Sequence, residues 1–228
     1  MNISDHPLGT LIETDSFVLL FGNRDSQIES LKTNFPEIRF KRIKQVHGPK
    51  LVHSSPHSID FSAEADAHYS NETHLGLCIS TADCIPIMIT STKPRWVASI
   101  HAGWRGIENR IFQNTAKSLI RLGCNPRTLL VFVGPHIQTT SFEVQNEVRD
   151  LLLKSADTWD TNHCWTAISE DKSLVNLNEI LKSQIEACQI PLENVFFEYK
   201  DTVKDPTYHS YRRDKDQSGR QLSFISLK

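Results

Sequence analysis

The chain has 228 residues, of which 39% are hydrophobic and 23% are charged, and its 25 Lys and Arg residues nearly balance 27 Asp and Glu residues. This length gives one large or two small domains able to bury a core, and the composition excludes disordered and fibrous proteins. The formal net charge is −2 and there is no long run of Lys or Arg. The sequence therefore gives no electrostatic basis for wrapping nucleic acid or for binding an anionic membrane.

The start of the chain, its apolar runs and its cysteine spacing indicate the cellular compartment in which the protein works. Residues 1–14 have neither a basic start nor a continuous apolar core, and no apolar run approaches the roughly 20 residues that cross a bilayer. The five cysteines are widely spaced without CxxC pairs, which argues against a disulfide framework or a four-cysteine zinc site. We expect a soluble, cytoplasmic protein.

The first third of the chain is predicted to be strand, helix, strand and loop. Residues 15–22 form an apolar run typical of a strand, and 26–35 have apolar residues at helical spacing before Pro36. Residues 38–46 suit a half-exposed strand that delivers His47. The polar segment 49–73 is expected to be mostly loop.

Three strands, two of them predicted to be buried, and a glycine loop follow. The strands are predicted at residues 75–79, 85–90 and 96–100, which are short apolar runs. After the third strand comes His101-Ala-Gly-Trp-Arg-Gly106, and a helix is predicted from Ile107 to just before Gly123. This is a strand, glycine loop and helix unit.

The last part of the chain alternates strands and helices. Strands are predicted at residues 129–133, 195–199 and 221–227, and helices at 142–153 and 174–188. Several strands follow one another directly, and there is no repeat or flexible linker. We expect residues 1–228 to form a single domain with a mixed sheet and helices packed outside it, rather than a doubly wound parallel fold.

Three potential metal ligands stand at predicted element ends beside Gly or Pro: His47, Cys84 and His101. Two imidazoles and a thiolate would fill three tetrahedral positions of Zn2+ and leave the fourth for water or substrate. Without a metal, the same neighbours would activate Cys84 as a nucleophile. The spacings of 37 and 17 residues are not a local metal signature, and from residue type alone a lone cysteine in an apolar strand is more often a small buried apolar residue.

Basic and acidic residues suggest a polar pocket. The glycine loop opens a helix, so its backbone N–H groups and Arg105 could bind phosphate, and Arg212 and Arg213 could add guanidinium groups. Each segment equally suits a tight turn or a solvated surface. Glu64 and Asp66 lie on one face if extended, where they could order water or ribose hydroxyls or merely cap a loop.

Taken in order, several motifs resemble the bacterial laccase-domain family, whose members are described as polyphenol oxidase, purine nucleoside phosphorylase or peptidoglycan editing factor. They are QVHG, EADA, TADC-IP, HAGWRG, GP-I followed by FEV, and SYRRD with GR at 219–220. The resemblance covers roughly residues 40–228. It implies an α+β fold, a four-layer α/β/β/α sandwich with mixed sheets, and carries the zinc ligands onto His47, Cys84 and His101.

The resemblance also implies phosphorolysis of adenosine, inosine and methylthioadenosine, together with deamination of adenosine. Its partners would be a purine nucleoside and phosphate, with the chain a monomer or homodimer. Arg105 with Arg212 or Arg213 would hold the phosphate, and Asp83 or Glu64 would shuttle a proton near the metal.

Other functions stay open. Cys84 could be the thiolate nucleophile of an amidohydrolase acting on a peptidoglycan precursor, and a structural zinc with a protein-binding surface is a non-enzymatic alternative. Cu2+ outranks Zn2+ in affinity for such ligands, but none of the ten histidines forms the His-x-His pairs of multicopper oxidases. The chain also departs from the family pattern: Asp201 replaces a common cysteine, His209 an aromatic residue and Gln138 a glycine.

Overall fold

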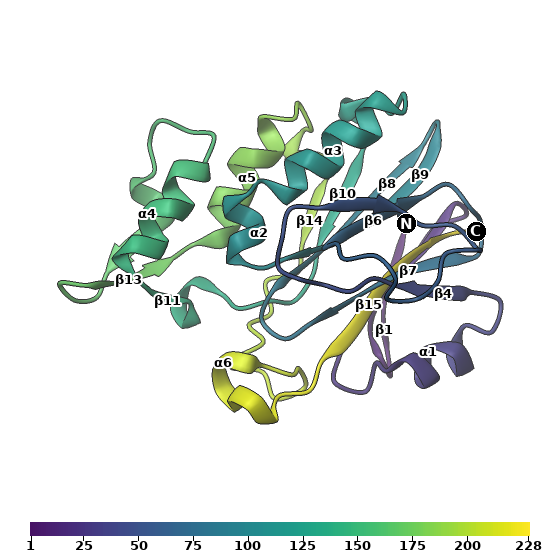
Figure 1. Ribbon diagram of the computed structural model, residues 1–228, viewed down its shortest axis with the longest axis horizontal. Coiled ribbons are helices and arrows are strands. Elements are labelled where there is room, and N and C mark those ends of the chain that lie inside the picture. The colour runs from purple at the N-terminus through teal and green to yellow at the C-terminus, as the bar shows by residue number, and fades with distance from the viewer.

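Two six-stranded mixed sheets stack face to face, and helices cover both outer faces (Figure 1). A computed structural model describes all 228 residues. The first sheet has, in spatial order, β1 (Asn2–His6), β2 (Gly9–Glu13), β3 (Phe17–Gly22), β15 (Gln221–Leu227), β7 (Leu75–Thr81) and β4 (Arg39–Arg42). Its neighbours are antiparallel except for the parallel pair β4 and β7.

The second sheet has, in spatial order, β14 (Val195–Phe197), β10 (Leu130–Val133), β8 (Ile85–Thr92), β9 (Arg95–Ala102), β6 (Ala67–Ser70) and β5 (Leu51–His53). Both of its outermost pairs are parallel. A third, small sheet joins β11 (Glu143–Gln145), β13 (Lys172–Val175) and β12 (Trp165–Ala167).

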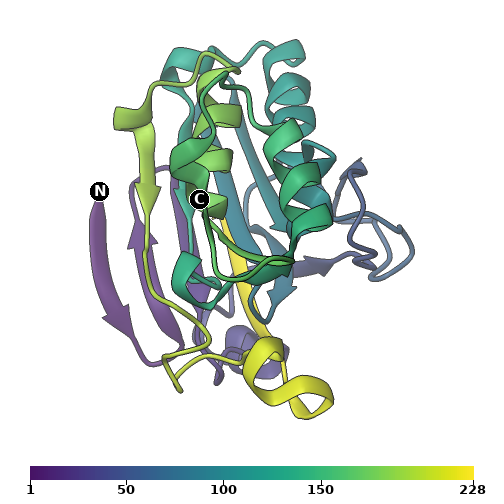
Figure 2. The same ribbon diagram turned by 90° about the vertical axis from the view of Figure 1, so that its left-hand side faces the viewer.

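Helices lie on opposite sides of this double sheet (Figures 1 and 2). They are α1 (Ile28–Asn34), α2 (Trp104–Glu108), α3 (Ile111–Arg121), α4 (Asn146–Ser155), α5 (Leu177–Glu186) and α6 (Tyr211–Asp214). Single turns of 3-10 helix occur at Pro126–Thr128, Thr139–Ser141, Asn162–Cys164, Leu192–Asn194 and Lys215–Gln217. None of the helices combines the length and apolar character that a membrane crossing requires.

Three apolar clusters fill the spaces between the layers. The largest packs α2–α5 on the second sheet, another lies between the two sheets, and the third packs α1 on the first sheet. Between the sheets, the rings of Phe17 and Phe132 lie 5.6 Å apart. Strands covered on both faces bury nearly every side chain, which is why β7 and β8 each begin with a run of mostly apolar residues. The fold is thus the α+β, four-layer α/β/β/α sandwich that the resemblance implied.

The structure also corrects several predicted elements. Segment 49–73, expected to be mostly loop, contains β5 and β6, and residues 1–14 form the hairpin of β1 and β2. The predicted helix after Gly106 is interrupted because Arg110 adopts a left-handed φ of 58°. The two later helices, predicted at 142–153 and 174–188, are each preceded by a strand of the small sheet.

Candidate active site

The structure brings together the three predicted metal ligands. One potential ligand atom from each of His47, Cys84 and His101 lies within 4.8 Å of the others, and the two imidazole rings are 4.7 Å apart, edge to face. His101 is buried, Cys84 is half-buried and His47 is exposed. The cluster is therefore fixed on one side and open to solvent on the other.

Both large sheets contribute to this cluster. His47 follows β4 of the first sheet, Cys84 stands in the turn that leads from β7 of the first sheet to β8 of the second, and His101 lies near the end of β9. Gln45 binds the backbone of Ser80 through both its amide nitrogen and oxygen, at 2.8 Å each. This link ties the segment that carries His47 to β7.

A buried carboxylate, Asp66, orients two of the ligands. Its Oδ1 lies 2.8 Å from His101 Nδ1, and its two oxygens accept hydrogen bonds from the backbone N–H groups of Val46, His47 and Gly48. Because the Nδ1–H of His101 donates to Asp66, Nε2 is the nitrogen left to bind a metal. The three backbone bonds also hold His47 at its left-handed φ of 60°.

Charges within the cluster shift the pKa values of its members. Burial alone would raise the pKa of the Cys84 thiol, but the charges and hydrogen bonds of His101 and His47 outweigh it and lower the pKa to about 6. Burial likewise opposes charging of His101, whose pKa is nevertheless raised to about 9 by Cys84 and Asp66. Without a metal, Cys84 and His101 are therefore a thiolate and imidazolium pair at neutral pH.

Gly103 permits the close approach of these side chains. A Cβ atom at this position would lie only 3.1 Å from both Cys84 Sγ and His47 Cδ2. Gly103 directly precedes α2. The glycine loop that was expected to bind an anion therefore packs against the three candidate metal ligands.

A cleft of about 470 Å³ opens beside the cluster. Its lining includes three aromatic side chains (Trp104, Phe142 and Tyr211) and three basic ones (Arg105, Arg212 and Lys215). None of these basic residues belongs to an ion pair of the protein. The cleft therefore offers apolar surfaces for a flat ring and unneutralised positive charge for an anion.

Two residues expected to bind substrate do not line this cleft. Glu64 is exposed and pairs with Lys44 at 2.8 Å, because an isolated β-bridge sets the two residues side by side. Arg213 donates to the backbone carbonyls of its own loop and pairs with Asp214 at 2.8 Å, so its guanidinium is already occupied. The structure thus assigns neither residue the contact with substrate that the sequence predicted.

Asp83 lines the cleft, and both of its carboxylate oxygens are hydrogen-bonded. Its Oδ1 accepts from the Thr202 hydroxyl at 2.7 Å, and its Oδ2 accepts from the backbone N–H of Arg212 at 2.6 Å. These contacts connect Asp83 to the C-terminal segment, and its role as a proton shuttle stays a prediction.

The three departures from the family pattern lie outside the cleft lining. Asp201 accepts from the Ser141 hydroxyl at 2.6 Å and from the Val203 N–H at 3.0 Å, so it fastens a loop. His209 packs on Gly219, and Gln138 binds Asn178.

Sequence reasoning missed the role of Asp66 and several cleft residues. Asp66 was singled out within EADA, but as a ligand for water or ribose. Phe142 was placed in a helix with a solvated face, and nothing in the local pattern marked Lys215. The EADA motif could have indicated the role of Asp66, since metal-binding histidines commonly donate their second ring N–H to a carboxylate.

Comparisons with known proteins agree with the motif resemblance. Residues 18–228 match the family model described as multi-copper polyphenol oxidoreductase laccase. Purine nucleoside phosphorylase YfiH of Escherichia coli strain K12 is 31% identical over 189 residues, covering 81% of this chain and 72% of that protein. The purine nucleoside phosphorylase of Deinococcus radiodurans is 28% identical over 188 residues, covering 82% and 70%.

Solved structures share the fold. The crystal structure of the Bacillus licheniformis hypothetical protein YfiH superposes with a TM-score of 0.85 at 22% identity and covers 99% of both chains. YlmD of Geobacillus stearothermophilus gives a TM-score of 0.80 at 24% identity, covering 88% of this chain and 78% of that one.

Proposed function

Because the chain belongs to the family described as multi-copper polyphenol oxidoreductase laccase, and because its curated relatives are named purine nucleoside phosphorylases, we propose that it is a zinc-dependent purine nucleoside phosphorylase that also deaminates adenosine. The observation that carries the proposal is that one cleft is lined both by His47 and Cys84 of the candidate metal site and by basic side chains without ionic partners.

The donor set favours zinc. Two imidazoles and a thiolate suit this ion, and three protein ligands leave a position open, whereas closed structural sites have four. Bound there, zinc would supply Lewis-acid chemistry at the open position. Copper would also bind these ligands, but a multicopper oxidase gathers several copper ions, and the cluster has donors for one. Metal analysis of the protein purified without added metal tests the assignment.

The cleft side chains support binding of both substrates. Arg105 and Arg212 can hold phosphate through paired N–H donors, and the faces of Trp104, Phe142 and Tyr211 can pack on a purine. In phosphorolysis the phosphate oxygen forms a bond to C1′ of the ribose while the bond from C1′ to the base breaks. Adenosine and phosphate then become adenine and ribose 1-phosphate.

Product analysis tests this proposal. The zinc-loaded protein incubated with adenosine and phosphate should yield adenine and ribose 1-phosphate, with inosine as the deamination product. Replacement of phosphate by sulfate should abolish only the first reaction. Cys84→Ala should lose both reactions, whereas the matched Cys124→Ala, which changes a buried core cysteine, should keep them. Equal turnover by wild type and Cys84→Ala would contradict the proposal.

A second candidate is a thiolate-dependent amidohydrolase acting on a peptidoglycan precursor. The low pKa of the metal-free Cys84, about 6, favours it because a thiolate is the nucleophilic form of cysteine. A covalent adduct between a peptidoglycan precursor and Cys84 in metal-free protein would support this candidate.

A further inference from the structure

Asp83 joins the turn that carries Cys84 to the C-terminal segment that carries Arg212. We propose that Asp83 is a positioning residue that sets the affinity of the cleft for phosphate by fixing the backbone of Arg212. This inference rests on the proposed function for the identity of the anion, and it concerns a residue that need not touch the substrate.

The geometry of Asp83 is built for this task. The residue is 8% exposed and has a left-handed φ of 85°, which few residues other than glycine, asparagine and aspartate adopt readily. Its two carboxylate oxygens accept from Thr202 and Arg212, and its backbone carbonyl accepts from the Ile137 N–H at 3.0 Å. Asp83 therefore holds three segments together, and Ile137 and Arg212 both line the cleft.

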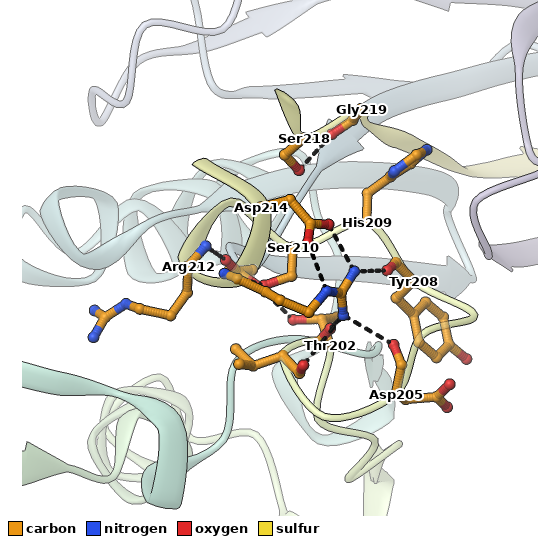
Figure 3. Close-up of polar contacts among 12 residues, drawn as sticks. Thr202, Asp205, Tyr208, His209, Ser210, Arg212, Asp214, Ser218 and Gly219 are labelled. Atoms are coloured by element: carbon orange, nitrogen blue, oxygen red, sulfur yellow. Dashed lines mark hydrogen bonds and ion pairs between the residues drawn. The ribbon is translucent and has the colours of Figure 1, made fainter. Parts of the chain in front are cut away.

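The C-terminal segment that Asp83 binds is organised from within by Arg213, whose partners Thr202, Tyr208 and Asp214 lie close together in Figure 3. The Arg213 guanidinium donates to the carbonyls of Thr202 at 3.0 Å, Val203 at 3.1 Å and Tyr208 at 2.9 Å, and it also pairs with Asp214. These bonds fold the segment upon itself, so the two bonds to Asp83 help to position it as a unit, together with the bonds of Asp201 to Ser141 and of Thr207 to Arg24.

The side chain of Arg212 points away from this polar group (Figure 3). It packs over the Phe142 ring at 5.9 Å and donates to the Glu143 carbonyl at 2.9 Å, so it has no anionic partner within the protein. The backbone N–H of Arg212 is bound to Asp83, while its guanidinium lies over the ring of Phe142, which also lines the cleft. Loss of the Asp83 carboxylate should make the backbone of Arg212 more mobile, and the position of its guanidinium should then be less well defined.

A carboxylate at position 83 can accept the hydrogen bonds of both Thr202 and Arg212. It accepts two hydrogen bonds at once, whereas the single oxygen of asparagine would leave Thr202 or Arg212 facing an NH2 group. The negative charge of the carboxylate also strengthens both hydrogen bonds, because charge-assisted bonds are stronger than neutral ones.

Three variants of the zinc-loaded protein test the proposal. Asp83→Gly removes the carboxylate and tolerates the left-handed φ, Asp83→Asn keeps one acceptor oxygen, and Thr202→Val deletes one of the two donors without touching Arg212. Each is titrated with inorganic phosphate by calorimetry, and the KM values for phosphate and adenosine are measured separately. Zinc content and Tm report whether the metal cluster and the fold persist.

We expect Asp83→Gly to weaken phosphate binding by about 10- to 100-fold, the range for loss of hydrogen bonds to a charged group. Asp83→Asn should be intermediate, and Thr202→Val should change the affinity by less than about tenfold because it loses a single bond. The KM for adenosine and the zinc content should stay near wild-type values in all three. A general structural defect would instead alter both KM values together.

Two outcomes would overturn the proposal. The first is that Asp83→Gly and Asp83→Asn bind phosphate as tightly as wild type, or that wild type does not bind phosphate at all. Either result would show that Asp83 does not set the affinity for phosphate. A large loss of kcat in Asp83→Asn with unchanged phosphate affinity would identify Asp83 as a proton carrier instead. The proposed function fails separately: wild type that binds phosphate in an Asp83-dependent way but turns over no nucleoside would keep the positioning role and reject the phosphorylase.

Discussion

Two buried aspartates organise the site from opposite sides. Asp66 binds His101 and the backbone around His47, while Asp83 binds Thr202 and Arg212. Both are nearly inaccessible to solvent, and each of their carboxylate oxygens has a hydrogen-bond donor, as buried polar atoms require. Asp66 and Asp83 therefore position the residues proposed to bind the metal and the phosphate without being proposed to bind either themselves.

Asp66→Asn should weaken zinc binding by about 10- to 100-fold, the usual effect of losing a supporting partner of a metal ligand. The amide would no longer favour the Nδ1–H form of His101 through charge, and one of the backbone donors around His47 would lose its acceptor. Competition with a chelator measures the affinity. Glu64→Gln is the matched control, since Glu64 is exposed and paired with Lys44, and it should bind zinc like wild type. Equal affinities for both variants would rule out the supporting role of Asp66.

The Cys84 pKa of about 6 predicts how metal-free protein reacts with iodoacetamide. Only the thiolate is alkylated, and thiolate is populated above the pKa. The rate at Cys84 should therefore rise between about pH 5 and pH 7 and then level off, whereas an ordinary thiol gains reactivity only near pH 8.5. Peptide mass spectrometry locates the label, and zinc should suppress it. A rate that still climbs steeply above pH 8 would show that the two histidines do not lower this pKa.

At the scale of elements, the loop between β9 and α2 fixes the spacing of the cluster. Gly103→Ala would place a methyl group 3.1 Å from Cys84 Sγ and His47 Cδ2, closer than carbon normally approaches either atom. We expect zinc affinity to fall by about tenfold, because the two ligands must move apart while the strands stay in place. The same chelator competition checks this. Gly123→Ala serves as a control for general glycine loss, since its nearest neighbour is 3.9 Å away, although its positive φ will cost some stability.

Buried strands could be predicted from the sequence more accurately than exposed ones. The strands β7, β8 and β9 were predicted close to their observed positions because nearly all of their residues are buried and each contains a run of apolar side chains. The hairpin of β1 and β2 escaped notice because only Ile12 among its strand residues is buried. Segments with little apolar surface leave no periodic pattern, and their strands form because neighbouring edges offer backbone partners.

The site was predictable in part for a similar reason. Metal ligands are chemically distinctive, so His47, Cys84 and His101 could be selected by type and by motif, and the structure brings them together. Arginines are common on surfaces, and local sequence cannot tell Arg212, which lines the cleft, from its neighbour Arg213, which binds carbonyls of its own loop. That difference depends on tertiary contacts with Asp83 and Phe142.

At the scale of the whole molecule, the candidate site spans the seam between the two large sheets. His47 follows β4 of the first sheet, His101 lies in β9 of the second, and Cys84 stands on the connection between the two sheets. A metal bound by all three would therefore link the two sheets directly. Binding to the folded state alone stabilises it by mass action, by about 2.7 kcal/mol when free ligand is 100 times Kd.

The seam itself is held by aromatic side chains such as Phe132, which packs on Phe17 and stacks on Phe196 at 5.0 Å. Phe132→Ala should lower the free energy of unfolding by about 3–5 kcal/mol, measured by denaturant titration without metal. Trp159→Ala is the control, because Trp159 is 97% exposed and surface changes usually stay within about 0.5 kcal/mol. If residues 1–228 are one domain, as the sequence predicts, each variant should unfold in a single transition.

Zinc should then offset part of the Phe132→Ala defect. Since the substitution lies in the core and leaves all three ligands intact, zinc at 100 times Kd should raise the stability of this variant and of wild type by the same amount, about 2.7 kcal/mol. Cys84→Ala should gain far less, because it lacks the ligand that connects the sheets. Equal zinc stabilisation of Cys84→Ala and wild type would mean that the metal binds elsewhere on the protein, and the seam would then be held by side-chain packing alone.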